Sequence, residues 1–117
     1  MTSKDLAYLK HIRDAIAKIA KYLGDISYDS FLENDLVQDA VIRQIEIMGE
    51  ATKRLSQEIR TSHPFIPWKS IAGMRDKLIH DYLGVDPDAV WDTVTNDLPA
   101  LKKEITNLIS QESKISI

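Results

Sequence analysis

Apolar residues in this chain recur at steps of three and four, the spacing that places them along one face of a helix. The first run of this kind covers Leu6, Leu9, Ile12, Ile16, Ile19 and Leu23. Gly24 follows at once and is suited to end the helix as its C-cap. No segment alternates between apolar and polar residues as a half-buried strand does. The sequence therefore predicts an all-α fold, an antiparallel bundle of four to five helices, in a single domain spanning residues 1–117.

A second helix is predicted to begin near Asn34 or Asp35, either of which can cap it, and to run to about Ile59. Its apolar surface is broad, because one stripe is widened by further apolar residues; together these are Val37, Ala40, Val41, Ile42, Ile45, Ile47, Met48, Ala51 and Leu55. A surface helix needs only one stripe facing its core. The breadth predicts a further partner and favours a homodimer, although a central position in the bundle explains it nearly as well.

Prolines separate the second helix from a third. Pro64 and Pro67 interrupt the pattern, and Pro67 is well placed at a first helical position. The third helix is predicted to run to about His80, with apolar residues at Trp68, Ile71, Met74 and Leu78.

A fourth helical segment follows a turn that Gly84 allows. Asp86 and Pro87 have the order of an N-cap followed by proline at the first helical position. Pro99 interrupts this segment and is expected to kink or split it.

The composition narrows the classes of function. Apolar residues make up 44% of the chain, enough to bury a core. The absence of cysteine excludes disulfides and thiolate metal sites and suits a reducing cytosol. No apolar run approaches the roughly 20 residues of a membrane span, and the charges in MTSKDLAYLKHIRD argue against an export signal. The protein is therefore expected to be cytoplasmic, with no membrane partner.

The charge pattern is ambiguous about nucleic acid. The net charge of −3 argues against a nucleic-acid-binding protein. Residues 43–82 nevertheless hold seven Lys/Arg against five Asp/Glu, so the middle of the chain is modestly basic. A bias of this size arises by chance about as often as by function.

Several kinds of site are missing from the sequence. His11, His63 and His80 have no metal-ligating partner at the spacings of local zinc motifs, so no metal or cofactor is expected. There is no glycine loop to hold phosphates and no nucleophile elbow. Glu46 and Glu50 lie one turn apart and could act as paired acids. A solvated charged face shared with Arg43, Lys53 and Arg54 is the better interpretation of these two residues.

The stretch RDKLIHDY carries the strongest candidate site, because Arg75, His80 and Tyr82 can all act on phosphate esters. A neutral imidazole can take the proton of a ribose 2′-OH. A guanidinium can stabilise the charge that builds up on the phosphoryl oxygens. On one regular helix Arg75 and His80 would lie about 140° apart around the axis and about 7.5 Å apart along it. Either the helix ends near His80, or two copies of the chain each supply half of the site.

A structural interpretation of the same stretch is simpler. Basic side chains near a helix C-terminus interact favourably with its dipole. The ring of Tyr82 can pack against its own bundle while its hydroxyl stays in water. From the residues alone this interpretation is the stronger one.

The pattern Arg75-x4-His80-x-Tyr82 resembles the R-x4-H-x-Y motif of HepT-like toxins in the HEPN superfamily. The surrounding stretches resemble that family in the same order: YLKHIRDAI, QDAVIRQIEIMGEATKRLS, HPFIPWKSIAGMRDKLIHDYLGVD and VWDTVTNDLPALK. The likeness covers nearly the whole chain. R-x4-H alone is a weak signal, whereas the combined run through the third helix is specific.

The resemblance implies a HEPN helical bundle that forms a homodimer with an RNA-cleaving cleft at its interface. It implies catalytic roles for Arg75 and His80, and makes Tyr82 the residue to which an MntA-type nucleotidyltransferase antitoxin adds AMP. Asp76 departs from the family, which most often has asparagine there. A carboxylate in this supporting position would hold Arg75 by charge but would repel phosphate. Glu50 and its neighbour Gly49 match a family stretch without a role of their own.

Two functions remain open. The leading one is the toxin of a two-gene toxin–antitoxin system, an endoribonuclease that needs no metal and uses 2′-OH attack. The alternative is a non-catalytic helical dimer that binds a nucleotidyltransferase or a nucleotide, which Asp76 and the acidic net charge favour slightly. A plain structural bundle would leave the motif unexplained.

Overall fold

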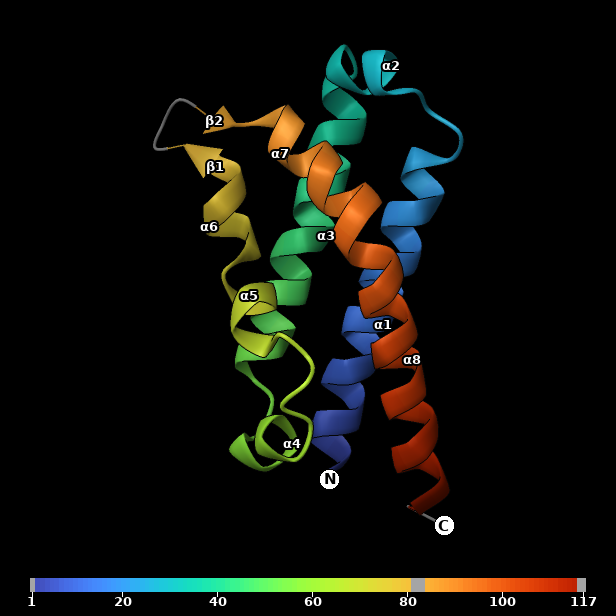
Figure 1. Ribbon diagram of the computed structural model, residues 1–117, viewed down its shortest axis with the longest axis vertical. Helices are drawn as coiled ribbons and strands as arrows, with labels where there is room; N and C mark the ends of the chain where they lie inside the picture. Colours follow the sequence, from blue (N-terminus) through green and yellow to red (C-terminus); the bar gives the residue numbers. More distant parts are fainter. Residues whose placement is uncertain (1, 81–83, 116–117) are drawn as a thin grey trace.

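Long helices form the frame of the molecule, and the first of them runs opposite to the others (Figure 1). The computed structural model describes the backbone over residues 2–80 and 84–115, and the side chains over 2–78, 84 and 86–112. The long helices are α1 (Ser3–Leu23), α3 (Asp35–Lys53) and α8 (Leu98–Ile115). The described residues extend over 47 × 30 × 20 Å. The predicted all-α bundle is confirmed.

Most helix ends that have local sequence signals lie where the signals place them, but Pro67 precedes its helix as the N-cap instead of being its first residue. Thr2 caps α1, and Gly24 ends it with a positive φ of 50° while its N–H bonds to the carbonyl of Ala20. Asn34 is the N-cap of α3, because its side chain accepts a hydrogen bond from the N–H of Val37. Asp86 caps α7 (Pro87–Asp92), whose first residue is the predicted proline. A short helix, α2 (Tyr28–Leu32), also forms in the connection between α1 and α3.

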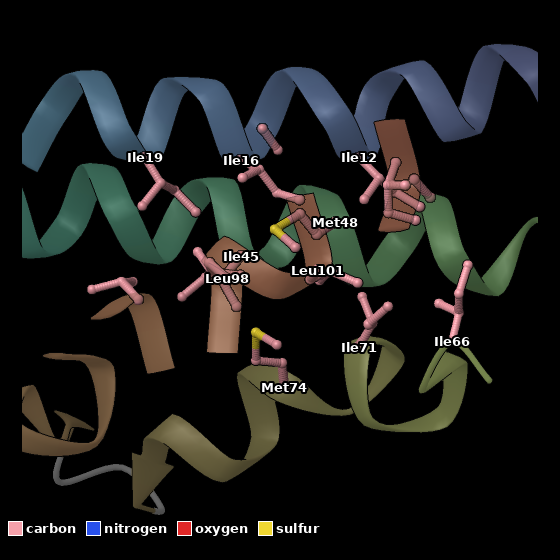
Figure 2. Close-up of a cluster of buried hydrophobic side chains, with 14 of the residues drawn as sticks. Ile12, Ile16, Ile19, Ile45, Met48, Ile66, Ile71, Met74, Leu98 and Leu101 are labelled. Carbon is pink, nitrogen blue, oxygen red and sulfur yellow. The ribbon is translucent and has the colours of Figure 1, made fainter. Parts of the chain in front are cut away.

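The broad apolar surface of α3 is explained by its central position. This helix packs against α1 on one side and against α5 (Trp68–Ala72) and α6 (Met74–Leu78) on another. Its residues Val41, Ile45 and Met48 are fully buried. Figure 2 shows Ile45 and Met48 facing isoleucines of α1 in the core. The central position therefore accounts for the breadth of the stripe, which gives no separate support for a homodimer.

The predicted continuation of the second helix to Ile59 is wrong. The helix ends at Lys53, and Ile59 belongs to a separate helix, α4 (Gln57–Ser62), which Ser56 caps. The side chain of Asp5 accepts hydrogen bonds from the Ser56 N–H at 2.8 Å and from the Ser56 hydroxyl at 2.7 Å. These bonds tie the turn to the start of α1. A partner 51 residues away fixes the break, and helical periodicity does not reveal it.

The predicted third helix is also divided. Gly73 separates α5 from α6, and α6 ends at Leu78 instead of His80. Ile79–His80 forms strand β1, which pairs antiparallel with β2 (Gly84–Val85). The N–H of Asp86 bonds to the carbonyl of Leu78 at 2.9 Å and closes the hairpin at its base.

Pro99 divides the last segment, as predicted. A π-helical turn, η2 (Thr93–Asp97), stands between α7 and α8, and the N–H of Leu98 bonds to the carbonyl of Thr93. Proline has no N–H to continue the regular ladder, and a π turn is a usual way to absorb such an interruption. Within the described residues no helix is both long and apolar enough to span a membrane.

The junction of Asp5 with Ser56 is expected to stabilise the bundle in a pH-dependent way. Burial by itself would raise the pKa of Asp5, but hydrogen bonds from Ser56 and Thr2 outweigh it and hold the pKa below its usual value of 3.8. Asp5→Ala should lower the free energy of unfolding by about 1–3 kcal/mol at pH 7, because buried donors lose their acceptor. Urea denaturation followed by circular dichroism measures this.

The pH dependence of the stability lost in Asp5→Ala provides a second test. A carboxyl whose folded pKa is depressed stabilises the fold above its unfolded pKa and loses this effect as pH falls through the folded value. The gap between wild type and Asp5→Ala should therefore shrink below pH 3.8. Asp14→Ala, an exposed acidic position on the same helix, should stay within about 0.5 kcal/mol of wild type. An equal difference in unfolding free energy at neutral and acidic pH would show that the ionised Asp5 carboxylate does not stabilise this junction.

Candidate functional site

A groove of about 440 Å³ runs beside α3, between α1 and the pair α5–α6. Charged side chains from α3 and α6 line much of it. Its lining residues are Tyr8, His11, Arg43, Glu46, Ile47, Gly49, Glu50, Ala51, Lys53, Arg54, Ala72, Arg75 and Asp76. The groove therefore brings the predicted arginine of the motif together with the charged face of α3.

Gly49 sets the distance between α3 and α5. A Cβ atom at this position would lie 3.2 Å from the carbonyl oxygen of Ala72 and 3.6 Å from that of Ile71. A side chain at this position would push the backbone of α5 outward by a few tenths of an ångström. Because α6 follows α5 after one residue, this contact also fixes where Arg75 enters the groove. In the sequence, Gly49 belongs to a stretch that resembles the family, but this packing role was not predicted.

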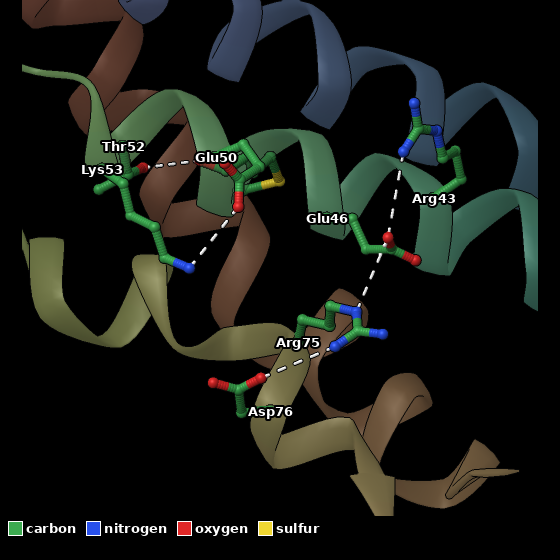
Figure 3. Close-up of polar contacts among 8 residues, drawn as sticks. Arg43, Glu46, Glu50, Thr52, Lys53, Arg75 and Asp76 are labelled. Atoms are coloured by element: carbon green, nitrogen blue, oxygen red, sulfur yellow. Dashed lines mark hydrogen bonds and ion pairs between the residues drawn. The ribbon is translucent and has the colours of Figure 1, made fainter. Parts of the chain in front are cut away.

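Arg75 lies in the first turn of α6, between the buried residues Met74 and Leu78. Its Nε is 3.7 Å from an Oε of Glu46, and its Nη1 is 3.9 Å from an Oδ of Asp76 (Figure 3). The side chain is 49% exposed. Both distances exceed those of charge-assisted hydrogen bonds. The guanidinium is thus oriented by charge and keeps N–H donors for a ligand.

Glu46 links two arginines across the groove. The same Oε that faces Arg75 lies 4.0 Å from Nη1 of Arg43, and Figure 3 shows the carboxylate between the two guanidinium groups. Glu50 instead pairs with Lys53 at 3.6 Å. The interpretation of these carboxylates as a solvated charged face fits this arrangement better than a pair of acids. The contact with Arg75 was missed, because 29 residues separate it from Glu46.

Asp76 is the carboxylate nearest to the motif arginine on its own helix. It is 79% exposed, so water screens its attraction for Arg75. Asp76 nevertheless lines the groove beside Arg75.

The remaining motif residues lie beyond α6. The backbone of His80 pairs with Gly84 in the hairpin, so Arg75 and His80 do not share one regular helix. Two arrangements could reconcile the separation of about 140° expected on one helix with a shared site: an early end of the helix, or a site made by two chains. The early end of the helix is observed. Gly84 has a φ of 102°, in keeping with its predicted turn. The side chain of His80 and the whole of Tyr82 lie outside the described residues.

Potential metal ligands are scattered in the part of the chain that the structure describes. Residues 2–78 and 86–112 contain no cluster of three or more His, Asp or Glu side chains with the geometry to hold a metal ion. His63 instead faces Glu112, with its Nε2 3.4 Å from an Oε of that residue.

Comparison with known proteins gives consistent matches over most of the chain. The family model described as ribonuclease HepT-like matches residues 12–108. A probable ribonuclease HepT of Thermococcus cleftensis is 45% identical over 86% of this chain and 92% of its own length. A "putative RNase" of Methanocaldococcus jannaschii is 42% identical, with 93% and 95% covered. Another, of Caldanaerobacter subterraneus, is 39% identical, with 90% and 94% covered. No solved structure gives a significant match.

The close approach at Gly49 should be sensitive to side-chain size. Gly49→Val should lower the free energy of unfolding by about 1–3 kcal/mol, because its side chain must displace the backbone of α5. Gly73→Ala is the control, since a Cβ there would be 3.5 Å from the nearest atom, an ordinary contact. It should stay within about 0.5 kcal/mol of wild type. Equal stability of the two variants in urea unfolding would show that the contact does not constrain α5.

Proposed function

Because the chain belongs to the HepT-like ribonuclease family of the HEPN superfamily, we propose that it is the toxin of a two-gene toxin–antitoxin system. In this proposal it is an endoribonuclease that cuts RNA without a metal ion, at a site completed by two copies of the chain. The observation that carries the proposal is Arg75, half-exposed in a charged groove and five residues before His80.

His80 is the general base of the proposed reaction. Its neutral imidazole takes the proton from a ribose 2′-OH, and the 2′-oxygen forms a bond to the adjacent phosphorus. The bond from phosphorus to the 5′-oxygen of the next nucleotide then breaks, and that oxygen receives a proton. The products are a 2′,3′-cyclic phosphate and a free 5′-OH.

Arg75 stabilises the negative charge that develops on the phosphoryl oxygens. The planar guanidinium can donate two parallel hydrogen bonds to them. Glu46 acts as a positioning residue, because it attracts the Nε side of the guanidinium at 3.7 Å. The phosphate then approaches the remaining N–H donors from the groove.

A two-fold homodimer completes the site. In one chain the described groove residues come from α1, α3, α5 and α6, and the side chain of Arg43 is 69% exposed. A second copy facing this surface would cover the bound RNA and add its own Arg75 and His80. The family resemblance supports this assembly, whereas the breadth of the apolar stripe on α3 does not.

A non-catalytic binding module is the second candidate. Arg75 has two carboxylates within ion-pair distance, those of Glu46 and Asp76. Because Glu46 also pairs with Arg43, these two arginines and two carboxylates carry no net charge together, which weakens the attraction of Arg75 for a phosphodiester. This observation favours a protein that binds a nucleotidyltransferase or nucleotide and no longer cuts RNA.

Control of the toxin is assigned to Tyr82, the third residue of the motif. A cognate MntA-type nucleotidyltransferase would transfer AMP to its hydroxyl and release pyrophosphate. The added phosphate would attract Arg75 by a charge-assisted pair and withdraw it from RNA. Serine and threonine are absent between Arg75 and Tyr82, so the tyrosine is the hydroxyl acceptor within the motif.

Removal of either catalytic side chain should abolish cleavage. Arg75→Ala and His80→Ala should each lower the rate on single-stranded RNA by about a hundredfold or more. The measurement is gel analysis of a labelled RNA with EDTA present, together with detection of cyclic phosphate ends. Expression of the wild type should arrest growth, and His80→Ala should not. Loss of activity with EDTA and recovery with magnesium would overturn the metal-free mechanism.

The same variants test whether two chains share one site. Mixed dimers of Arg75→Ala and His80→Ala retain one copy of each group and should recover part of the activity. Light scattering should report a dimer at micromolar concentration. A monomer with no recovery on mixing would place the whole site in one chain.

AMP addition at Tyr82 should be visible in the mass of the intact protein. Co-expression with the neighbouring nucleotidyltransferase should add whole AMP units and remove the ribonuclease activity. Tyr82→Phe should show neither the mass gain nor the inhibition. If the partner still neutralises Tyr82→Phe, inhibition proceeds by binding alone and the covalent mechanism is wrong.

A further inference from the structure

The groove continues past Arg75 along a surface that the proposed chemistry does not use. Tyr8 and His11 enter it from α1, three residues apart and so on one face of that helix. Arg43 and Arg54 enter it from α3. We refer to these four residues as the α1–α3 wall.

The charge of the groove is opposite in sign to that of the whole molecule. The chain has a net charge of −3. The groove lining instead holds four Lys/Arg side chains against three Asp/Glu, with His11 in addition. A local excess of cations on an acidic protein selects for an anionic ligand at that place.

The cations of the wall are free to change partners. Arg43 lies 4.0 Å from Glu46 and is 69% exposed, so this ion pair is weak. Arg54 makes no ion pair with any residue in the described part of the chain. The intervening carboxylate of Glu50 is drawn to Lys53 at 3.6 Å, which reduces its repulsion of an anion.

The spacing of the two arginines matches a nucleic-acid strand. They are eleven residues apart on α3, which places them within about 20° of each other around the axis and about 16 Å apart along it. At the rise of about 3.4 Å per nucleotide in one stacked strand, this length covers four or five nucleotides. Glu46, and with it Arg75, lies between them along the helix.

We infer that the α1–α3 wall binds the RNA strand on both sides of the cleaved phosphate. Arg43 and Arg54 bind phosphates about four or five nucleotides apart, and Tyr8 provides a ring on which an unstacked base lies. This inference rests on the proposed ribonuclease function and extends its site. It makes the enzyme a reader of single-stranded RNA several nucleotides long.

An aromatic ring among the cations favours RNA over an acidic protein surface. The Tyr8 ring stands at 82° to the ring of His11, with the centroids 6.0 Å apart. Single-stranded RNA offers both phosphates for arginine and exposed base faces for such a ring.

The test separates binding from cleavage. The parent is the full chain with His80→Ala, and the probe is a fluorescein-labelled single-stranded RNA of about twelve nucleotides, followed by anisotropy at several salt concentrations. Adding Arg43→Gln and Arg54→Gln should weaken binding at least tenfold. The slope of log K against log salt should fall by about 1.4, or about 0.7 for each lost phosphate contact. Tyr8→Leu should weaken binding while the salt slope stays unchanged.

The matched control is Lys102→Gln with Lys103→Gln. Both lysines are exposed on α8, outside the groove lining, and the control removes the same number of charges. It should leave RNA affinity within twofold. With His80 intact, the arginine variants should raise KM on the long RNA by a larger factor than they lower kcat. Equal thermal unfolding of all variants would show that the arginine changes preserve the fold.

The outcomes separate this inference from the proposed function. If the wild type cuts RNA and the arginine variants bind it as tightly as the control, the wall is not an RNA surface. If the arginine variants keep RNA affinity and lose the nucleotidyltransferase partner, the wall is a protein interface and the inference is wrong. If the wild type neither binds nor cuts RNA, the proposed function itself fails.

Discussion

The position of Arg75 depends on how closely α5 can lie against the backbone of α3. Gly49 makes that contact possible, since a Cβ there would come within 3.2 Å of the carbonyl of Ala72. The short helix α6 follows from α5 and is anchored by Met74 and Leu78 in the core. A five-residue helix has no stability of its own. The motif arginine is therefore held by tertiary packing, and its helix would not persist without it.

The ion pairs in the groove are weak, so their charged side chains can exchange partners. The ion pairs among Arg43, Glu46, Glu50, Lys53 and Arg75 have distances of 3.6–4.0 Å. Hydrogen-bonded ion pairs have N···O distances of about 2.7–2.9 Å, and pairs as exposed as these contribute at most about 1 kcal/mol each. A phosphate can therefore replace a carboxylate beside an arginine at small cost. Because this ion pair is weak, Glu46 can orient Arg75 without preventing it from contacting a substrate.

Sequence reasoning succeeded where a structural signal is local and failed where it is not. Gly24, Asn34 and the pair Asp86–Pro87 define helix ends through their own side chains or backbone, and these ends were predicted. The break after α3 was not predicted, because it depends on a contact of Ser56 with Asp5, 51 residues away. Within the site, Arg75, His80 and Tyr82 were singled out by their residue types and by their resemblance to the family motif. The contact between Arg75 and Glu46 of α3 was not predicted, because only the folded chain brings these two residues together.

The two catalytic candidates have different kinds of support, and this bears on regulation. Arg75 belongs to a helix whose flanking residues are buried in the core. His80 lies beyond the end of that helix, in a hairpin tied by the pairs Ile79–Val85 and His80–Gly84 and by the bond of the Asp86 N–H to Leu78. Tyr82 lies two residues after His80 in the sequence. Under the proposed function, a modification of Tyr82 would act close in sequence to the general base, whereas Arg75 is held by a helix packed into the core. Control at Tyr82 would then silence the protein without unfolding it.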